Sequence, residues 1–421
     1  MPSRQDQLHS HQFLVQRVVA ALVLRDADPG RSPFPRAAGA TLASVLVAAI
    51  ALGAVALHGT ITGSGSPRWL DGPAVLVERE SGARLVHREG TLHPVPNHVS
   101  ALLVLGPGAQ TVLVSREAIE GVPRGVPLGI EHAPDAVPDR RRLTTGAWSV
   151  CATSDDVAVL VGAAPAGGAP LGEHGLLVRA GGDLHLVWQQ RRHLIRDTDL
   201  VLSALGWSGE RPATVTPALL AALPAGPELA RVPIAGGAQS VVPGSAVGDV
   251  FVVESQGGGR QYAVALRAGL APITQLQADL LLTDHDQREP IRLSQGAYAD
   301  LPRAIPPDAA GLPTTTPPLA APGAAVCAVV PGESGVAEVS VGAAVPRAGV
   351  VVPPGTAALV EAGDIYLVTD RGRRHALSDR EVPALLGYGD ARPLRLPPAV
   401  VALVPEGVRL DPAVARAPLG G

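Results

Sequence analysis

The second half of the chain repeats the pattern of the first half, and this duplication constrains the fold more than any other feature. Gly182-Asp-Leu-His-Leu-Val187 matches Gly363-Asp-Ile-Tyr-Leu-Val368 much further along the chain. The offset continues without a gap, so that Leu205-Gly206-Trp207 matches Leu386-Gly387-Tyr388. Similarity at a fixed offset is typical of repeated folding units. The chain is therefore expected to contain two similar halves.

A weaker match extends the duplication toward the N-terminus. Val77-Glu78 and Arg84 correspond to Val253-Glu254 and Arg260, at an offset close to that of the first match. The halves then cover roughly 73–235 and 249–412. Each half contains room for two small modules.

Short apolar runs, glycine turns and brief helical segments alternate within each half. The chain contains 48 Gly and 41 Pro among its 421 residues, which disfavours long helices there. We predict an α+β fold, mainly β, in which four small repeats surround a central β core with pseudo-two-fold internal duplication. The predicted repeat modules are 73–106, 173–235, 249–300 and 356–412; the two core parts are 107–165 and 301–350, and a flexible tail covers 413–421.

Apolar, β-branched runs mark the predicted core. Residues 111–114 and 157–161 are the strands expected in its first part. Residues 324–330 and 337–341 are those expected in its second part. Such runs are typical of buried strands.

The two cysteines of the chain occupy equivalent places in the two halves. Cys151 and Cys327 both follow Val and precede Ala, and their separation equals the offset that relates Val77 to Val253. Equivalent residues close to a pseudo-two-fold axis face each other, which would bring the two Cα atoms within disulfide range. We predict a disulfide between them. Two buried free thiols are the alternative, and a metal site would need more ligands.

A long uncharged segment precedes the duplicated region. Residues 37–67 contain no Asp, Glu, Lys or Arg. A helix of this length can cross about 30 Å of hydrocarbon while satisfying its own backbone hydrogen bonds. We predict an N-terminal single transmembrane helix at 37–62. A cleaved signal peptide and a buried core helix are the alternatives.

The arginines around this segment predict its orientation. Five Arg residues lie before it, whereas Arg68 alone lies close after it. The positive-inside rule places residues 1–36 in the cytoplasm and the larger part outside the plasma membrane. The cytoplasmic tail contains a helix candidate at 13–24. Its apolar residues cover more than one face, which favours contact with a partner or the membrane surface.

Few residues indicate catalysis or cofactor binding. All 34 basic residues are Arg, so the Lys of a phosphate-binding P-loop is absent. Gly257-Gly-Gly-Arg260 could imitate a phosphate loop, but a hairpin turn is the simpler interpretation. His87, His93 and His98 lie on different short elements, which argues against zinc. No catalytic, metal or cofactor site is predicted, and ATP remains the alternative ligand.

Charge also restricts the class of partner. The formal net charge of −4 and the aromatic content of 3% argue against a nucleic-acid-binding protein. Arg140-Arg-Arg142 could bind a phosphate or a partner, although a solvated charge run is the simpler interpretation. Asp155-Asp156 is interpreted as a turn or solvent-facing pair, because adjacent strand residues point to opposite faces.

Several motifs resemble those of one known family, and the likeness extends over essentially the whole chain. They are the N-terminal stretch 1–24, the uncharged segment, Gly82-Ala-Arg-Leu-Val86, Leu92-His-Pro-Val95 and Ser100-Ala-Leu-Leu103. By these motifs the sequence resembles EccB, a membrane-core component of the ESX, or type VII, secretion systems of mycobacteria and related actinobacteria. It departs from that family in lacking Lys and in its short C-terminus after Leu410.

The resemblance implies a structural, membrane-anchored subunit with a periplasmic domain of four repeats. It implies assembly with EccC (an FtsK-like motor ATPase), EccD and EccE, and homo-oligomerisation through the periplasmic domain. The family is sometimes labelled as ATPase, so an ATP-hydrolysing ectodomain is one alternative. A cell-wall-binding module on a membrane anchor is another.

Overall fold

The computed structural model describes residues 4–24, 34–63, 69, 72–153, 155–234, 236–254, 259–332, 337–345 and 348–419. The chain divides into two compact units, Met1–Gly72 and Pro73–Gly421. Each unit is described by itself.

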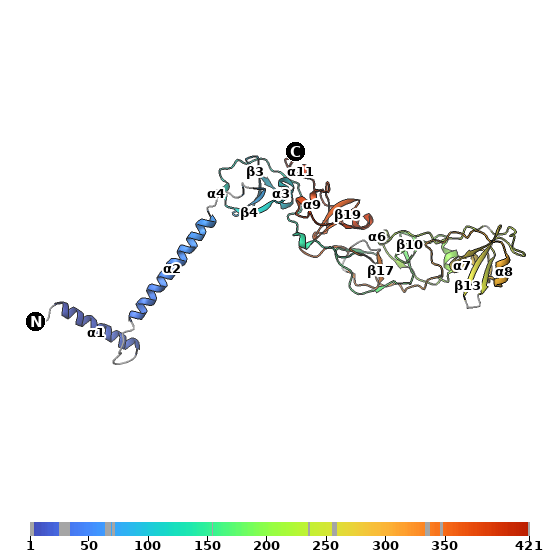
Figure 1. Cartoon of the computed structure of the whole chain (residues 1–421), viewed down its shortest axis with the longest axis horizontal. Coiled ribbons are helices and arrows are strands. Elements are labelled where there is room, and N and C mark those ends of the chain that lie inside the picture. The colour runs from blue at the N-terminus through green and yellow to red at the C-terminus, as the bar shows by residue number, and fades with distance from the viewer. Residues whose placement is uncertain are drawn as a thin grey trace. The chain divides into compact units, whose positions relative to one another are not determined.

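The N-terminal unit contains two helices, α1 (Arg4–Leu24) and α2 (Phe34–Gly63) (Figure 1). The helix candidate at 13–24 is therefore the second half of a longer helix. The uncharged segment at 37–62 lies within α2. Across the described ranges, no helix combines the length and the apolar character that a membrane crossing requires.

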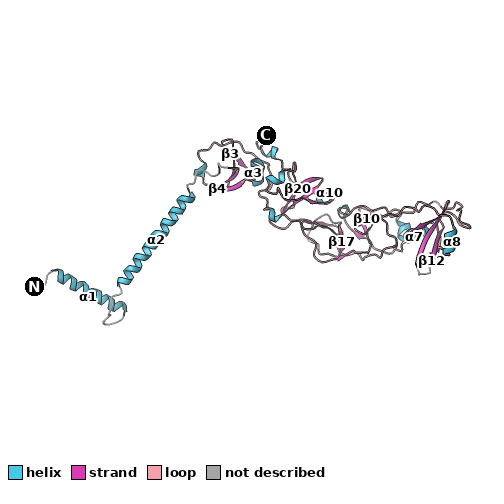
Figure 2. Cartoon of the chain, in the orientation of Figure 1, coloured by secondary structure: helices cyan, strands magenta, loops and turns pink. Residues whose placement is uncertain are grey.

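Four sheets in the described part of the second unit share one strand order. Figure 2 colours the strands of the chain magenta. In each of the four sheets, the first three strands form an antiparallel meander, and a fourth strand pairs in parallel with the free edge of the first. One helix connects the third strand to the fourth, and a second helix follows the fourth. We name each sheet with its two helices a module.

The first two modules lie on either side of the first cysteine in sequence. Module 1 consists of β1 (Ala74–Glu78), β2 (Arg84–Arg88), β3 (Thr91–Val95), α3 (His98–Leu105), β4 (Gln110–Val114) and α4 (Arg116–Ile119). Module 2 consists of β8 (Leu176–Ala180), β9 (Asp183–Trp188), β10 (Arg191–Leu194), α5 (Thr198–Ala204), β11 (Ala213–Thr214) and α6 (Pro217–Ala221).

The other two modules lie on either side of the second cysteine. Module 3 consists of β12 (Val250–Glu254), β13 (Arg260–Leu266), β14 (Gly269–Ile273), α7 (Gln275–Asp284), β15 (Ile291–Leu293) and α8 (Gln295–Asp300). Module 4 consists of β19 (Ala357–Ala362), β20 (Asp364–Thr369), β21 (Arg374–Ala376), α9 (Val382–Leu385), β22 (Leu394–Arg395) and α10 (Pro398–Val401).

A central sheet joins strands from both halves in the order β18-β6-β5-β16-β17-β7. Its strands are β5 (Trp148–Ala152), β6 (Val157–Leu160), β7 (Ala169–Pro170), β16 (Val326–Val330), β17 (Glu338–Val341) and β18 (Gly349–Val351). Among the described residues of the second unit, two short helices lie outside the modules, the 3-10 helix η2 (Arg140–Arg142) and α11 (Pro412–Ala415).

Residues 111–114 are placed differently from the expectation. The sequence favoured the central core, but β4 pairs in parallel with β1 in the sheet of module 1. Thr111 and Leu113 are exposed on this strand. The reason is that β1 has a free edge for a parallel partner, and a β-branched run carries no information about which edge it will join.

Local capping explains where two of the module helices begin. Asn97 precedes α3, and its side-chain oxygen accepts a 2.8 Å hydrogen bond from the amide of Ser100. Thr274 and Gln277 form a reciprocal capping box at the start of α7. Such caps satisfy amides that lack a partner in the first helical turn.

The first strand of modules 2 and 4 contacts a different neighbour through each of its two faces. In β8, Val178 packs into the core shared with the central sheet, whereas Leu177 packs against module 3. In β19, Val360 packs toward the central sheet and Leu359 toward module 1. Because strand side chains alternate between faces, one strand contributes to two cores.

Three cores therefore connect the second unit. Modules 2 and 4 share one with the central sheet, modules 1 and 4 share a second, and modules 2 and 3 share a third. The helix pairs α3 with α9 and α5 with α7 cross these outer junctions. The prediction of a mainly β, α+β fold built from several small sheets is confirmed.

Candidate functional site

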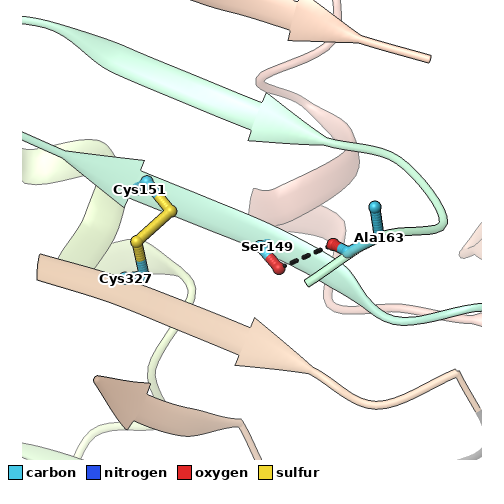
Figure 3. Close-up of a disulfide and its surroundings, with 4 residues drawn as sticks. All are labelled: Ser149, Cys151, Ala163 and Cys327. Atoms are coloured by element: carbon cyan, nitrogen blue, oxygen red, sulfur yellow. Dashed lines mark hydrogen bonds between the residues drawn. A yellow bond between two sulfur atoms is a disulfide. The ribbon is translucent and has the colours of Figure 1, made fainter. Parts of the chain in front are cut away.

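The centre of the second unit is a disulfide between the two halves. Cys151 in β5 and Cys327 in β16 are register partners, with their Cα atoms 4.0 Å apart and their sulfur atoms bonded. Figure 3 shows the bridge between the two neighbouring strands. The site residues named from the sequence are thus brought together.

The disulfide lies on the face of the central sheet opposite to the main core. Trp148 and Val150 face the core shared with modules 2 and 4, whereas both cysteines form a smaller cluster with Leu160 and Ala343. Both cysteines are fully buried. A soluble reductant therefore has no direct access to the sulfurs in the folded protein.

Ser149 fixes the loop that follows β6. Its hydroxyl donates a 2.9 Å hydrogen bond to the carbonyl of Ala163 (Figure 3). Ser149 is buried, so this bond satisfies a polar group that would otherwise be costly. The same strand thus carries the disulfide and an anchor for its neighbouring loop.

A polar groove of about 1300 Å³ lies between modules 1 and 4. Arg371 and Asp135 form a 2.8 Å ion pair between its walls, and both side chains are more than half exposed. Arg142 of η2 and His132 also line the groove. The walls carry both signs of charge, so the groove does not select ligands by net charge alone.

Tyr388 forms a hydrogen bond with Pro138, one of the residues that line this groove. Its hydroxyl donates a 2.7 Å hydrogen bond to the carbonyl of Pro138, and its ring is almost fully buried in the core of modules 1 and 4. Burial raises the pKa of Tyr388 well above the usual tyrosine value, with a smaller contribution from Asp139. The phenol therefore remains a hydrogen-bond donor at ordinary pH.

A backbone segment runs beside the third strand of every module, and we call it the strap. The straps are residues 123–128, 224–229, 302–304 and 405–410 for modules 1 to 4. Each strap begins with a proline whose carbonyl accepts a hydrogen bond from an amide of the third strand; these prolines are Pro123, Pro224, Pro302 and Pro405.

Histidines hold three of the four straps. The Nδ1 atoms of His93, His193 and His375 lie 2.9, 2.8 and 2.9 Å from strap carbonyl oxygens. Each ring covers a strap glycine, at which an added Cβ would come closer than 3.0 Å to the ring; these are Gly125, Gly226 and Gly407. We call each pair of His and Gly a clasp.

The clasp histidines of modules 2 and 4 lie in apolar surroundings. Burial is the main cause that lowers the pKa of His193, and it also lowers the pKa of His375. Arg191 and Arg373 act in the same direction through charge repulsion. Both rings therefore favour the neutral form.

The clasps were missed because the sequence match was read without a gap. At the offset that relates Gly182 to Gly363, His193 aligns with Arg374. The strand register instead makes His375 its equivalent, since His193 pairs with Leu186 and His375 with Leu367. The β20–β21 hairpin is one residue longer than the β9–β10 hairpin. The stretch from the clasp histidine to the Leu-Gly pair just after the following helix is one residue shorter in module 4 than in module 2, so the later matches return to the original offset. The signal that could have revealed the clasps was a His present in both halves but displaced by one position from the ungapped match.

The other residues considered from the sequence lie apart. His93 belongs to a clasp, and no group of three or more metal-ligating side chains occurs among the described residues. Arg140 of η2 pairs with Asp390 at 3.1 Å, whereas Arg142 lines the groove. Gly257 lies outside the described residues, and Arg260 begins β13. Asp156 lies in the turn between β5 and β6.

Solved structures share this architecture. The subunit in a structure of an intact ESX-5 inner membrane complex is 27% identical, with a TM-score of 0.70 over 100% of this chain and 96% of that one. A structure of an EccB3 dimer from the ESX-3 core complex is 26% identical, with a TM-score of 0.67 over 82% of this chain and 100% of that one. The fold is therefore that of a subunit of ESX membrane complexes.

Sequence comparisons agree with the structural ones. The family described as "Type VII secretion system ESX-1, transport TM domain B" matches residues 1–419. The chain belongs to this family, known as EccB. The resemblance noted from the N-terminal motifs is confirmed.

Two relatives illustrate the range of similarity. The "ESX-2 secretion system ATPase EccB2" of Mycobacterium tuberculosis is 32% identical over 322 residues, which are 73% of this chain and 62% of the relative. The "ESX-3 secretion system ATPase EccB3" of Mycolicibacterium smegmatis is 28% identical over 466 residues, covering 96% of this chain and 88% of the relative. The match thus spans less than two thirds of the first relative.

Proposed function

We propose that this protein is a structural subunit of a type VII secretion complex, which it scaffolds on the outer side of the membrane. The observation that carries the proposal is the similarity over the whole chain to the subunit of an intact ESX-5 inner membrane complex. The modules share continuous apolar cores, which favours a stiff scaffold. Secretion energy would then come from a partner motor.

The proposed topology has one membrane anchor at 37–62, with the N-terminus in the cytoplasm. Its support is the absence of charged residues over 37–67 and the excess of Arg before this segment. Reporter fusions test it: a fusion after Leu24 should be active only as a cytoplasmic reporter, and one after Leu419 only as an extracytoplasmic one. Cytoplasmic activity of the second fusion would contradict the topology.

We further propose that the four modules are repeats related by duplication of a two-module half. Their common strand order and the equivalent positions of Cys151 and Cys327 support this relationship. In this arrangement module 1 corresponds to module 3, and module 2 to module 4.

The proposed partners are subunits of the EccC, EccD and EccE type, together with further copies of this chain. Support comes from the relatives, whose structures are of an inner membrane complex, a periplasmic assembly and a dimer. The cytoplasmic helix α1 exposes Phe13, Leu14 and Leu22, which favours contact with another subunit or with lipid.

Affinity purification tests the assembly. The tagged full chain, extracted from its native membrane in mild detergent, should migrate as a large complex in native electrophoresis and contain an FtsK-like ATPase and a multi-span protein. A matched variant with Phe13→Glu and Leu14→Glu should lose partners that contact α1. Recovery of the wild-type chain alone would oppose the proposal.

ATP hydrolysis is the competing function, because the curated relatives carry the word ATPase in their names. The chain has no Lys for a P-loop, so a nucleotide site would need Arg as its cation. Turnover of ATP by the purified protein above a mock preparation, lost in Arg260→Ala but kept in Arg267→Ala, would support the competing function. We expect no turnover above the mock preparation.

A further inference from the structure

Module 2 holds its strap through the side chain of His193 as well as through the backbone. The amide of Gly226 donates to the carbonyl of Arg192 at 2.9 Å, and the amide of Leu229 donates to the carbonyl of Leu194 at 2.8 Å. Between them, Nδ1 of His193 lies 2.8 Å from the carbonyl oxygen of Pro227. The ring is thus placed at the centre of the strap.

Module 3 shows that the strap can form without histidine. There Ala271 takes the place of the clasp histidine on the third strand, and Ala304 takes the place of the clasp glycine. The amide of Ala304 still donates to the carbonyl of Leu270 at 2.9 Å. His with Gly and Ala with Ala are therefore two solutions to the same packing problem.

Hydrogen bonding fixes the position of the proton in the clasp. A backbone carbonyl only accepts hydrogen bonds, so Nδ1 of His193 must carry the proton. Nε2 then has a free lone pair, and within the described part of the chain this buried atom has no hydrogen-bond partner. A second proton would have to be placed on Nε2, which makes no hydrogen bond in the described structure; the carbonyl of Trp188 favours the charged ring, but less than burial opposes it.

The charged neighbours oppose a second proton as well. The titratable groups on the elements packed against His193 are Arg191 and Arg192 on its own strand, His185 and Asp183 on β9, and Glu228 on the strap, which pairs with Arg196 at 3.0 Å. Glu228, the acidic residue of the strap, is therefore already paired with Arg196. A buried imidazolium in this place lacks both a counter-ion and a solvent contact.

We propose that protonation of His193 at Nε2 releases the strap of module 2 and loosens the contact between modules 2 and 3. The ring must leave its buried place to hydrate the new N–H group, and its bond to Pro227 is lost with it. Leu229, at the end of the strap, is fully buried in the core that modules 2 and 3 share. Through the strap, the protonation state of His193 therefore affects the contact between modules 2 and 3.

The direction of the pH effect follows from the lowered pKa of His193. The stabilisation by the neutral ring is complete above the ordinary histidine value of 6.5, and it is lost as the pH falls through the folded-state pKa. Between 6.5 and the folded-state pKa, the equilibrium for strap opening rises by up to about tenfold per pH unit, and it levels off below the folded-state pKa.

Hydrogen exchange of the full chain in detergent, between about pH 7.5 and about pH 5, measures this opening. After correction for intrinsic rates, exchange at Gly226 and Leu229 should accelerate in acid, by up to about tenfold for each pH unit below 6.5. Ala304 in the histidine-free strap of module 3 is the internal control and should not accelerate. Equal behaviour of the two straps would overturn the proposal.

Two variants separate titration from packing. The double variant His193→Ala with Gly226→Ala copies the pair found in module 3, and should keep the strap protected without its pH dependence. His193→Asn retains a donor for the Pro227 carbonyl but has no proton to gain, and should give the same flat profile. If either variant keeps the acid-induced acceleration of hydrogen exchange seen in the wild type, the proposal is wrong.

Discussion

Cys151 and Cys327 are far apart in sequence but directly opposite each other on β5 and β16, and their disulfide joins the two halves of the second unit. In these adjacent antiparallel strands, Cys151 is the last residue but one of β5 and Cys327 is the second residue of β16. A pseudo-two-fold axis through this strand pair would exchange one cysteine for the other. The bridge therefore closes a very long loop of the chain.

Removal of the disulfide should destabilise the second unit. For Cys151→Ala with Cys327→Ala we expect a loss of about 2–5 kcal/mol, because a bridge across so long a loop strongly restricts the unfolded chain. Urea denaturation of the full chain in detergent, followed by tryptophan fluorescence, measures the change.

Ser340→Ala is the matched control for the disulfide variant, since Ser340 pairs with Cys327 in register and its hydroxyl has no hydrogen-bond partner in the described structure. We expect no loss of stability from this change. Equal unfolding midpoints for the double cysteine variant and the wild type would show that the bridge contributes nothing to stability.

Tyr388→Phe should weaken the junction between modules 1 and 4. The change leaves the carbonyl of Pro138 without its 2.7 Å donor, which costs about 1–2 kcal/mol when the group is buried. Tyr366→Phe, in β20 of the same module, is the control. No hydrogen bond to the Tyr366 hydroxyl is present in the described residues, so this variant should match the wild type in denaturation.

Alkaline titration should reveal the raised pKa of Tyr388. Its folded-state pKa is raised above 10.0, so the stabilisation by the neutral phenol is complete below that value and is lost as the pH rises through the folded-state pKa. Absorbance at alkaline pH should show one tyrosine that ionises only with unfolding. This late phase should be absent from Tyr388→Phe and present in Tyr366→Phe.

Gly407→Ala should destabilise module 4 because the added Cβ collides with the ring of His375. We expect a cost of about 1–3 kcal/mol, typical of overpacking. Adding His375→Ala should recover most of this loss, as the alanine pair in module 3 suggests. Gly389→Ala, where a Cβ meets only Ala384 at ordinary contact distance, is the control. A fully additive double variant would contradict the clasp.

The exposed ion pairs beside the groove should contribute little. Arg140 and Asp390 are 52% and 87% exposed, and Arg371 and Asp135 are 69% and 56% exposed. Solvent screening and side-chain entropy hold such pairs below about 1 kcal/mol each. Asp390→Asn and Asp135→Asn should therefore shift the denaturation midpoint less than Tyr388→Phe does, and the reverse order would contradict this ranking.

The mainly β character predicted from the sequence is confirmed. The duplication and the equivalence of the cysteines were also predicted, because residue types and their spacing can be compared along the chain. Sequence reasoning placed residues 111–114 wrongly, since β4 pairs with a strand that is distant in sequence and any β-branched run could do so. It also missed the clasps, because an extra residue in one hairpin hides the match between His193 and His375.

The sequence by itself determined the family, the uncharged segment and the alternation of side chains that makes each first strand two-faced. These properties depend on residue types and their spacing, which are local. The tertiary structure alone decided which face of β8 or β19 meets which neighbour, which edge β4 joins, and that a histidine covers a glycine from a distant part of the chain. Such contacts depend on complementary shapes and unpaired hydrogen-bonding groups that only meet once the chain has folded.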